Sequence, residues 1–299
     1  MQQDFSEIGF ANSQLLHRQQ VREKWLLWAL ALPSLLIISF AVLTPLSWLF
    51  HLSFIGDDGN YSLENYRTIV EQRSYARTFA TTFQVSICTT LICIALGFPF
   101  AYFLVHLPKR LASLIFVVVL LPCLTSLLVR TYAWLVLLQK DGLINTFALT
   151  IGLVDAPLQL VYNFTGTLVG MVHIMLPFFV LPVYSSISKI DQKLLPAAAT
   201  LGARPSIAFC YVFLPLAFPA IAAGGLIVFI LCLGFYVTPA VLGGGRVTMV
   251  SNQITAILEN RFDWGAASAL GVVLLLTTFA TLFLLILIFR FSTRFLGRG

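Results

Sequence analysis

Residues 264–289 read WGAASALGVVLLLTTFATLFLLILIF, a run of 26 residues without a charged side chain. An α-helix needs about 20 apolar residues to cross the roughly 30 Å hydrocarbon core of a bilayer. The apolar residues are continuous rather than alternating, which excludes the strands of a membrane β-barrel. The stretch therefore predicts a membrane-spanning helix near the end of the chain.

Five more runs of this kind precede it, over residues 25–50, 79–105, 111–138, 165–184 and 209–233. The whole chain of 299 residues is 59% hydrophobic and only 10% charged, whereas soluble domains carry about 25% charged residues. A soluble protein of this length could not bury so much apolar surface. We expect an all-α integral membrane protein with six transmembrane helices in one domain, residues 25–290. Segment 1–24 would precede this domain and a tail, 291–299, would follow it.

Basic residues favour one orientation of these spans. Eleven Lys or Arg fall in the two termini and the two loops on their side, and six fall in the three loops opposite. Because basic loops stay cytoplasmic, we expect both termini inside the cell. The first span lacks a small-residue cleavage site and should be retained. The opposite loops are long, and a short surface helix is expected around residues 62–72. Charges are scattered, with no cluster denser than Lys109-Arg110, so no nucleic-acid partner is expected.

The chain lacks the residues that would power transport or catalyse a reaction. His173 is the one ionisable residue near the middle of a span other than thiols, and a single imidazole there more often donates to a neighbouring helix than relays protons. No GxxxxGK[ST] loop is present to bind ATP. No paired acids or HExxH motif indicates an enzyme, and the five cysteines lack zinc-site spacing. We expect a subunit that binds no cofactor or metal and is driven by a partner; an ion-coupled carrier acting alone is the alternative.

Residues 185–208, between the fourth and fifth spans, contain the stretch LLPAAATLGARP at 194–205. Pro196 suits the first turn of a helix, where its missing N–H costs nothing, and the following alanines favour helix. Gly202 can take the left-handed conformation that closes a helix, and Pro205 is expected to prevent its resumption. Such a short, smooth helix could lie in a groove of another protein or rest on the bilayer surface, and composition alone favours neither.

Ala197-Ala198, Gly202-Ala203, Phe209 and Leu214-Pro215 resemble the EAA loop of binding-protein-dependent ABC importer permeases. The resemblance implies a type I importer bundle whose coupling helix docks on a cytoplasmic ATPase. The coupling residues implied by this motif are Pro196, Ala197, Ala198, Leu201, Gly202, Ala203 and Arg204. Pro196 stands where the family has an acid, which removes a potential salt bridge to the ATPase.

Residues 121–134, 142–145, 236–244 and 63–66 resemble permeases of the spermidine/putrescine type. The resemblance implies import of a polyamine or related organic cation across the bacterial cytoplasmic membrane. It also implies an ATPase dimer that binds ATP and Mg²⁺, a second related permease, an outer solute-binding protein and surrounding lipid. Phe235 replaces the acid that many polyamine permeases have after the glycine.

Four aromatic residues in the outer halves of the third and fifth spans are candidates for the substrate pathway: Tyr132, Trp134, Phe235 and Tyr236. Aromatic faces hold an ammonium group at about 0.5–2 kcal/mol each, weakly enough to release it. A belt at the membrane interface is the other interpretation, above all for Trp134 and Trp264. Arg130 would be costly in lipid and should face the bundle or another subunit, with a structural role beside Asp141 or Asp263.

Overall fold

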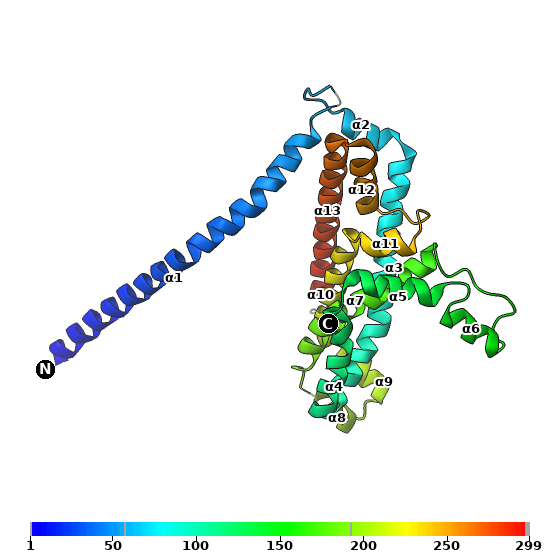
Figure 1. Ribbon diagram of the computed structural model, residues 1–299. Coiled ribbons are helices and arrows are strands. Elements are labelled where there is room, and N and C mark those ends of the chain that lie inside the picture. Colours follow the sequence, from blue (N-terminus) through cyan, green and yellow to red (C-terminus); the bar gives the residue numbers. More distant parts are fainter. Residues whose placement is uncertain (1, 57, 192, 297–299) are drawn as a thin grey trace.

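The computed structural model describes residues 2–56, 58–191 and 193–296, and side chains at 25 and over 28–287 within these ranges. The described residues are almost entirely helical (Figure 1). The α-helices are α1 Gln2–Ser53, α2 Glu64–Glu71, α3 Arg73–His106, α4 Lys109–Leu120, α5 Leu127–Leu138, α6 Leu143–Thr150, α7 Phe164–Ile187, α8 Leu194–Thr200, α9 Pro205–Ala208, α10 Leu214–Leu233, α11 Val237–Leu242, α12 Val250–Arg261 and α13 Trp264–Leu296. A 3₁₀ turn, η1 Leu121–Leu124, and a π-helical turn, η2 Phe209–Phe213, complete the elements.

Helices α3, α7 and α10 pack against one another and form the core of the bundle. Glycines allow the close approach, because a Cβ on Gly97 of α3 would collide with the ring of Phe179 on α7. A Cβ on Gly224 of α10 would lie 2.8 Å from Val183 Cγ2 of α7. Small residues at such contacts let membrane helices gain dispersion energy where water is absent. Close helix contacts at small residues are therefore present in the core.

The third expected span, residues 111–138, is not one straight helix. The helical segment Lys109–Leu124 and the segment Leu127–Thr150 meet at an angle of 97°. Pro122 has no N–H to donate to the preceding turn, and Thr125 and Ser126 have extended backbone angles, with ψ of 157° and 136°. Within the described part of the chain, five helices are individually long and apolar enough to span a membrane, and the bent pair makes a sixth candidate.

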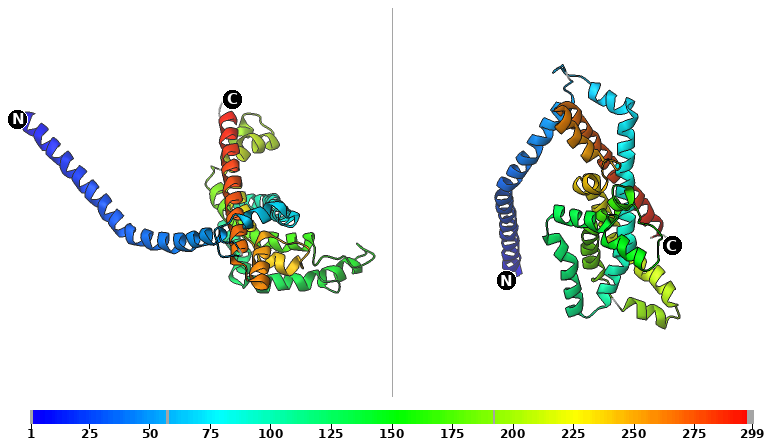
Figure 2. Two further views of the ribbon diagram at one scale, coloured as in Figure 1. Left: turned by 90° about the horizontal axis from the view of Figure 1, so that it is seen from above. Right: turned by 45° about the vertical axis from the view of Figure 1, so that its right-hand side comes forward.

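Helix α1 is continuous from Gln2 to Ser53 and shows no break at the expected boundary between residues 24 and 25. Only its C-terminal part approaches the body of the protein, where it meets α13, and the rest projects outward (Figures 1 and 2). Within its apolar segment Trp28–Ser53, a stretch long enough to cross the membrane has no residue buried against the rest of the chain. This surface is therefore available to lipid or to another subunit. At the other end of the chain, α13 runs past residue 290 to Leu296, and residues 297–299 of the expected tail lie outside the described residues.

The two ends of the bundle carry different short helices (Figure 1). Helices α2 and α12 lie at one end, whereas α8 and α9 lie at the opposite end. Helix α2, Glu64–Glu71, confirms the surface helix expected around residues 62–72. The loop between the fourth and fifth spans is thus separated by the length of the bundle from the loop that contains α2.

Candidate functional site

The stretch expected to couple the chain to an ATPase folds as α8 and a glycine turn. Gly202 has a φ of +86°, which confirms the predicted left-handed residue. Its N–H donates to the Ala199 carbonyl at 3.0 Å, and the Ala203 N–H donates to the Ala198 carbonyl at 3.1 Å. This pair of bonds is the Schellman motif, which satisfies carbonyls left free at a helix end. The geometry makes a glycine necessary at position 202.

The structure confirms the expectation for one of the two prolines of this stretch. Pro196 is the third residue of α8 and lies in its first turn, as expected, where no N–H is needed from it. Pro205 does not end helical structure but is the first residue of α9, with Arg204 as the extended residue before it. The prediction that Pro205 prevents resumption is wrong, because the fixed φ of proline suits the first position of a new helix.

Helix α8 packs against the bundle on one side and is exposed on the other. Leu195 packs against the core cluster, and α8 contacts α9 and η2. Leu201 is 89% exposed, and Pro196, Ala197, Gly202 and Arg204 are also exposed, whereas Ala198 and Ala203 are half-buried. An isolated exposed leucine needs no explanation in general, but here it sits beside a rigid turn at the end of the bundle. The segment offers a small, preformed surface.

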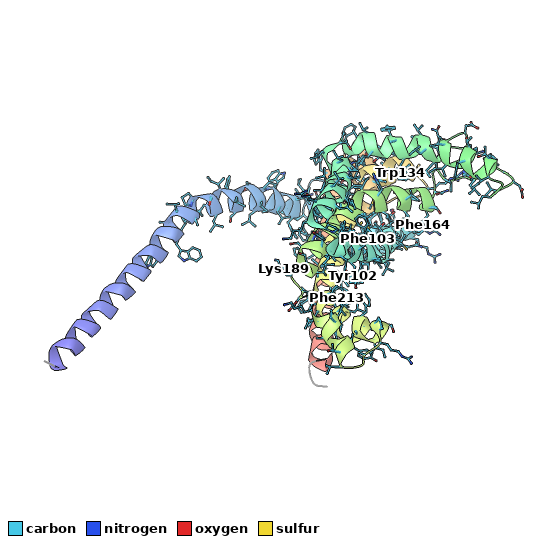
Figure 3. All side chains as sticks on the ribbon, turned by 90° about the horizontal axis from the view of Figure 1, so that it is seen from below. Tyr102, Phe103, Trp134, Phe164, Lys189 and Phe213 are labelled. Carbon is cyan, nitrogen blue, oxygen red and sulfur yellow. The ribbon has the colours of Figure 1, made fainter. Side chains whose placement is uncertain are left out.

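A π-helical turn connects this segment to the core. The Leu214 N–H donates to the Phe209 carbonyl, five residues back. Pro215 explains the wide turn, because it cannot donate to the residue four positions before it and its ring crowds that carbonyl. Phe209 and Phe213 pack on Tyr102 of α3, with ring centroids 5.3 and 4.9 Å from the tyrosine ring. Figure 3 shows Tyr102 and Phe213 side by side.

Sequence reasoning did not identify this aromatic contact as part of the site. Phe98, Tyr102 and His106 recur at intervals of four residues, as do Phe209 and Phe213. Residues four apart share a helix face, so this spacing was the available signal. Because α8 packs on η2, this contact connects α8 through η2 to α3, one of the three core helices.

The four candidate pathway residues lie about half-way along the bundle, near α5 and α11 (Figure 1). Tyr132 and Trp134 belong to α5, whereas Phe235 and Tyr236 lie between α10 and α11. Helices α5 and α11 pack together, and the Thr131 and Thr238 hydroxyls are 3.4 Å apart at their contact. The structure thus brings the two segments together.

The four rings nevertheless have different surroundings. Tyr132 and Tyr236 are 53% and 41% exposed. Trp134 is half-buried and meets His173 of α7 edge-on, with centroids 5.5 Å apart, and Phe235 packs on the core cluster. Among the described side chains, the ring contacts found do not join any two of the four. Tyr132 and Tyr236 are therefore the two exposed members of the set in this chain.

Arg130 does not form the ion pair expected with Asp141 or Asp263. Its Nε and Nη1 atoms are buried without a hydrogen-bond partner. Asp263 Oδ1 instead accepts from the Ala266 N–H at 2.8 Å, in the first turn of α13. That bond satisfies a backbone donor at the start of α13, and this start lies against Ile55 and Asn65 near α2, whereas Arg130 belongs to α5. No group of three potential metal ligands occurs among the described residues.

Residues 94–298 match the family model for the binding-protein-dependent transport system inner membrane component. This match covers the C-terminal part of α3, all of α7 and α10, the candidate coupling segment around α8 and the candidate pathway. The chain belongs to this family. It is a permease subunit of an ABC importer and a multi-pass inner-membrane protein, and this family identity accounts for the six apolar runs predicted from the sequence.

Relatives in the family include permeases with named substrates. The spermidine/putrescine transport system permease protein PotB of Salmonella typhimurium is 31% identical over 281 residues, covering 92% of each chain. The putative 2-aminoethylphosphonate transport system permease protein PhnU of Salmonella typhimurium is 27% identical over 259 residues, covering 85% of this chain and 90% of PhnU. Both are similar along most of their length, so the similarity includes the whole bundle.

A solved structure supports the fold independently. A chain in the crystal structure of a bacterial alginate ABC transporter, in complex with an alginate pentasaccharide-bound periplasmic protein, has a TM-score of 0.73. The match covers 94% of this chain and 98% of that chain at 16% identity. At this identity the likeness shows the fold alone, and it agrees with an importer permease bundle.

Proposed function

We propose that this permease imports a small organic amine of the polyamine kind, using ATP that partner ATPases bind with Mg²⁺ and hydrolyse. The observation that carries the coupling part is the exposed α8 segment, closed by the left-handed Gly202. Its docking residues are those of the EAA-like motif, from Pro196 to Arg204. In this arrangement the end of the bundle with α8 is cytoplasmic, together with both termini.

The domain of residues 25–290 has six spans in this proposal, with the bent pair of helices counted as the third. Permeases of this kind act in pairs, and a second related permease completes the pathway. A solute-binding protein docks at the end with α2 and α12. The alginate transporter in complex with its periplasmic protein supports this type of partner.

The substrate class is supported by the similarity to PotB. Tyr132 and Tyr236, with Trp134 and Phe235 behind them, supply the aromatic surface that an ammonium group can cross. Weak interactions suit a pathway, because a solute must leave each site as well as enter it.

Purification of the tagged permease tests the proposal. An ATPase and a second permease should co-purify, and reconstituted vesicles loaded with ATP should accumulate the amine only when the binding protein is present outside. Uptake that persists without ATP and collapses with a proton ionophore would instead indicate an ion-coupled carrier. A matched Gly202→Val sample that assembles and inserts but does not take up solute would assign the coupling to α8.

A further inference from the structure

The break between α4 and α5 creates a helix N-terminus between the two halves of the bent span. Helix α5 begins at Leu127, about half-way between the two ends of the molecule (Figure 1). Its N-cap residue, Ser126, makes no side-chain hydrogen bond to the first turn. The N-terminal turn of a helix carries a partial positive charge and free N–H groups. Discontinuous helices in transporters use such ends to hold charged solutes near the middle of the membrane.

Arg130 adds a full positive charge to this same turn. Its N–H closes the first intrahelical bond of α5, to the Ser126 carbonyl at 3.1 Å. A cation at a helix N-terminus is electrostatically unfavourable, and the Nε and Nη1 atoms have no partner. Among the described residues, no Asp or Glu forms an ion pair with it. This arrangement is costly unless an anion binds there for part of the cycle.

His173 and Trp134 complete the surroundings of the guanidinium. Arg130 lies one helical turn before Trp134 on α5, α5 contacts α7, and His173 Nδ1 of α7 is a third buried polar atom without a partner. Trp134 meets the His173 ring edge-on at 5.5 Å (Figure 3 labels Trp134). Three polar atoms from two helices are thus enclosed with no acceptor among the described side chains.

We propose that Arg130 and His173 bind the acidic group, a carboxylate or phosphonate, of a solute that also carries an amine. The inference rests on the proposed function and narrows its substrate class from a plain amine to an amine that bears an acid. Guanidinium groups bind carboxylate and phosphonate oxygens strongly because each N–H donates to a charged acceptor. The solute's ammonium group would lie toward the ring of Trp134, one turn along the same face of α5 and edge-on to His173.

The site is enclosed in this conformation and opens when α5 moves away from α7. Helix α5 packs chiefly on α11 and only slightly on α7, so Arg130 and His173 can separate without breaking the α3–α7–α10 core. PhnU, whose printed name specifies a zwitterionic aminophosphonate, shows that a relative is associated with this solute chemistry.

The test uses the complete importer with its binding protein in proteoliposomes. ATP-driven uptake is measured for putrescine, for 4-aminobutyrate, which replaces one amine of putrescine by a carboxylate, and for 2-aminoethylphosphonate. Variants are Arg130→Gln and Arg130→Lys, with Arg110→Gln as control, since Arg110 is exposed in α4. We expect uptake of an acid-bearing amine in preference to putrescine. Arg130→Gln should lower that uptake about tenfold or more, Arg130→Lys should retain part of it, and Arg110→Gln should be unchanged.

Three results would refute the acidic subsite, and a fourth would refute the proposed function. Uptake of putrescine that is unchanged in Arg130→Gln would leave the proposed function standing and refute the acidic subsite. An equal loss for all solutes, with less co-purifying second permease, would assign Arg130 to an acid of that subunit. An equal loss that follows the anionic-lipid content of the vesicles would assign it to a lipid phosphate. Absence of ATP-driven uptake for both solute classes would overturn the proposed function itself.

Discussion

The coupling segment and the helical core of this permease contrast in what they require from their residues. The turn after α8 is open, with nothing within 4 Å of a Cβ placed on Gly202, and it requires a particular backbone angle. Gly97 in the core has an ordinary helical backbone and requires empty space, because Phe179 fills the place of a side chain. Glycine is thus required at position 202 for its backbone conformation and at position 97 for its small size. A substitution should therefore impair ATP-driven uptake at position 202 and lower thermal stability at position 97.

The strongest test of this contrast is Gly202→Val. A β-branched residue is strongly disfavoured at positive φ, so the turn should change shape while the bundle stays intact. We expect ATP-driven uptake to be abolished with normal membrane insertion, measured by vesicle transport and by the amount of protein in the membrane. Gly152→Val is the matched control, since Gly152 has a φ of +71° and equally open surroundings after α6. Normal transport by Gly202→Val would remove the reason to call this turn a coupling element.

Gly97→Ala should have the opposite signature. The added methyl group must displace the Phe179 ring in a close-packed core, which costs about 1–3 kcal/mol. Thermal unfolding of the purified permease in detergent should shift to lower temperature. Gly234→Ala provides the comparison, because Gly234 has no atom within 4 Å of its Cβ position and a φ of −94°. Equal stability of the two variants would show that Gly97 does not set the helix spacing.

Leu201→Asp separates exposed surface from backbone conformation within the coupling segment. Leu201 is 89% exposed in the isolated chain, and burying a leucine against a partner gains about 1.5–3 kcal/mol. We expect roughly tenfold less ATPase to co-purify, with no change in thermal unfolding. Leu153→Asp is a suitable control, since Leu153 is 74% exposed after α6. Unchanged ATPase binding by Leu201→Asp would confine the docking to other residues of the segment.

The smallest effect is expected at the end with α2. The Arg67 Nε and Glu71 Oε1 atoms are 2.6 Å apart, but both side chains are mostly exposed. Exposed pairs of this spacing contribute only about 0.3–0.5 kcal/mol. Glu71→Gln should therefore leave uptake within a factor of two and thermal unfolding almost unchanged. A large loss of uptake, with unfolding unaffected, would show that α2 participates in partner docking.

The parts of the fold that depend on local physics were predictable from the sequence. Continuous apolar runs identified the spans, because a bilayer selects for length and hydropathy alone. The short helix α2 and the left-handed Gly202 also followed from nearby residues. Each of these features depends on residues within one or two turns of the chain.

The features that depend on distant residues were not predicted. Residues 111–138 are as apolar as the other runs, and Pro122 indicated a kink but not an angle of 97°. Charge alone suggested an acid beside Arg130, yet Asp263 is engaged by a helix start. The contact of Tyr102 with Phe209 and Phe213 joins residues more than 100 positions apart, and only the packed bundle reveals it.

The π-helical turn at Phe209–Phe213 holds one residue more than an α-helical turn would need. Deleting one residue there would let the helix close normally, but everything on the α9 side would rotate by about 100° and advance by about 1.5 Å. The surface around Leu201 would then face a new direction with its own shape unchanged. The number of residues in this turn thus sets the rotation of the coupling segment relative to α10. Lengthening or shortening the turn would change the direction that the segment faces without altering any of its side chains.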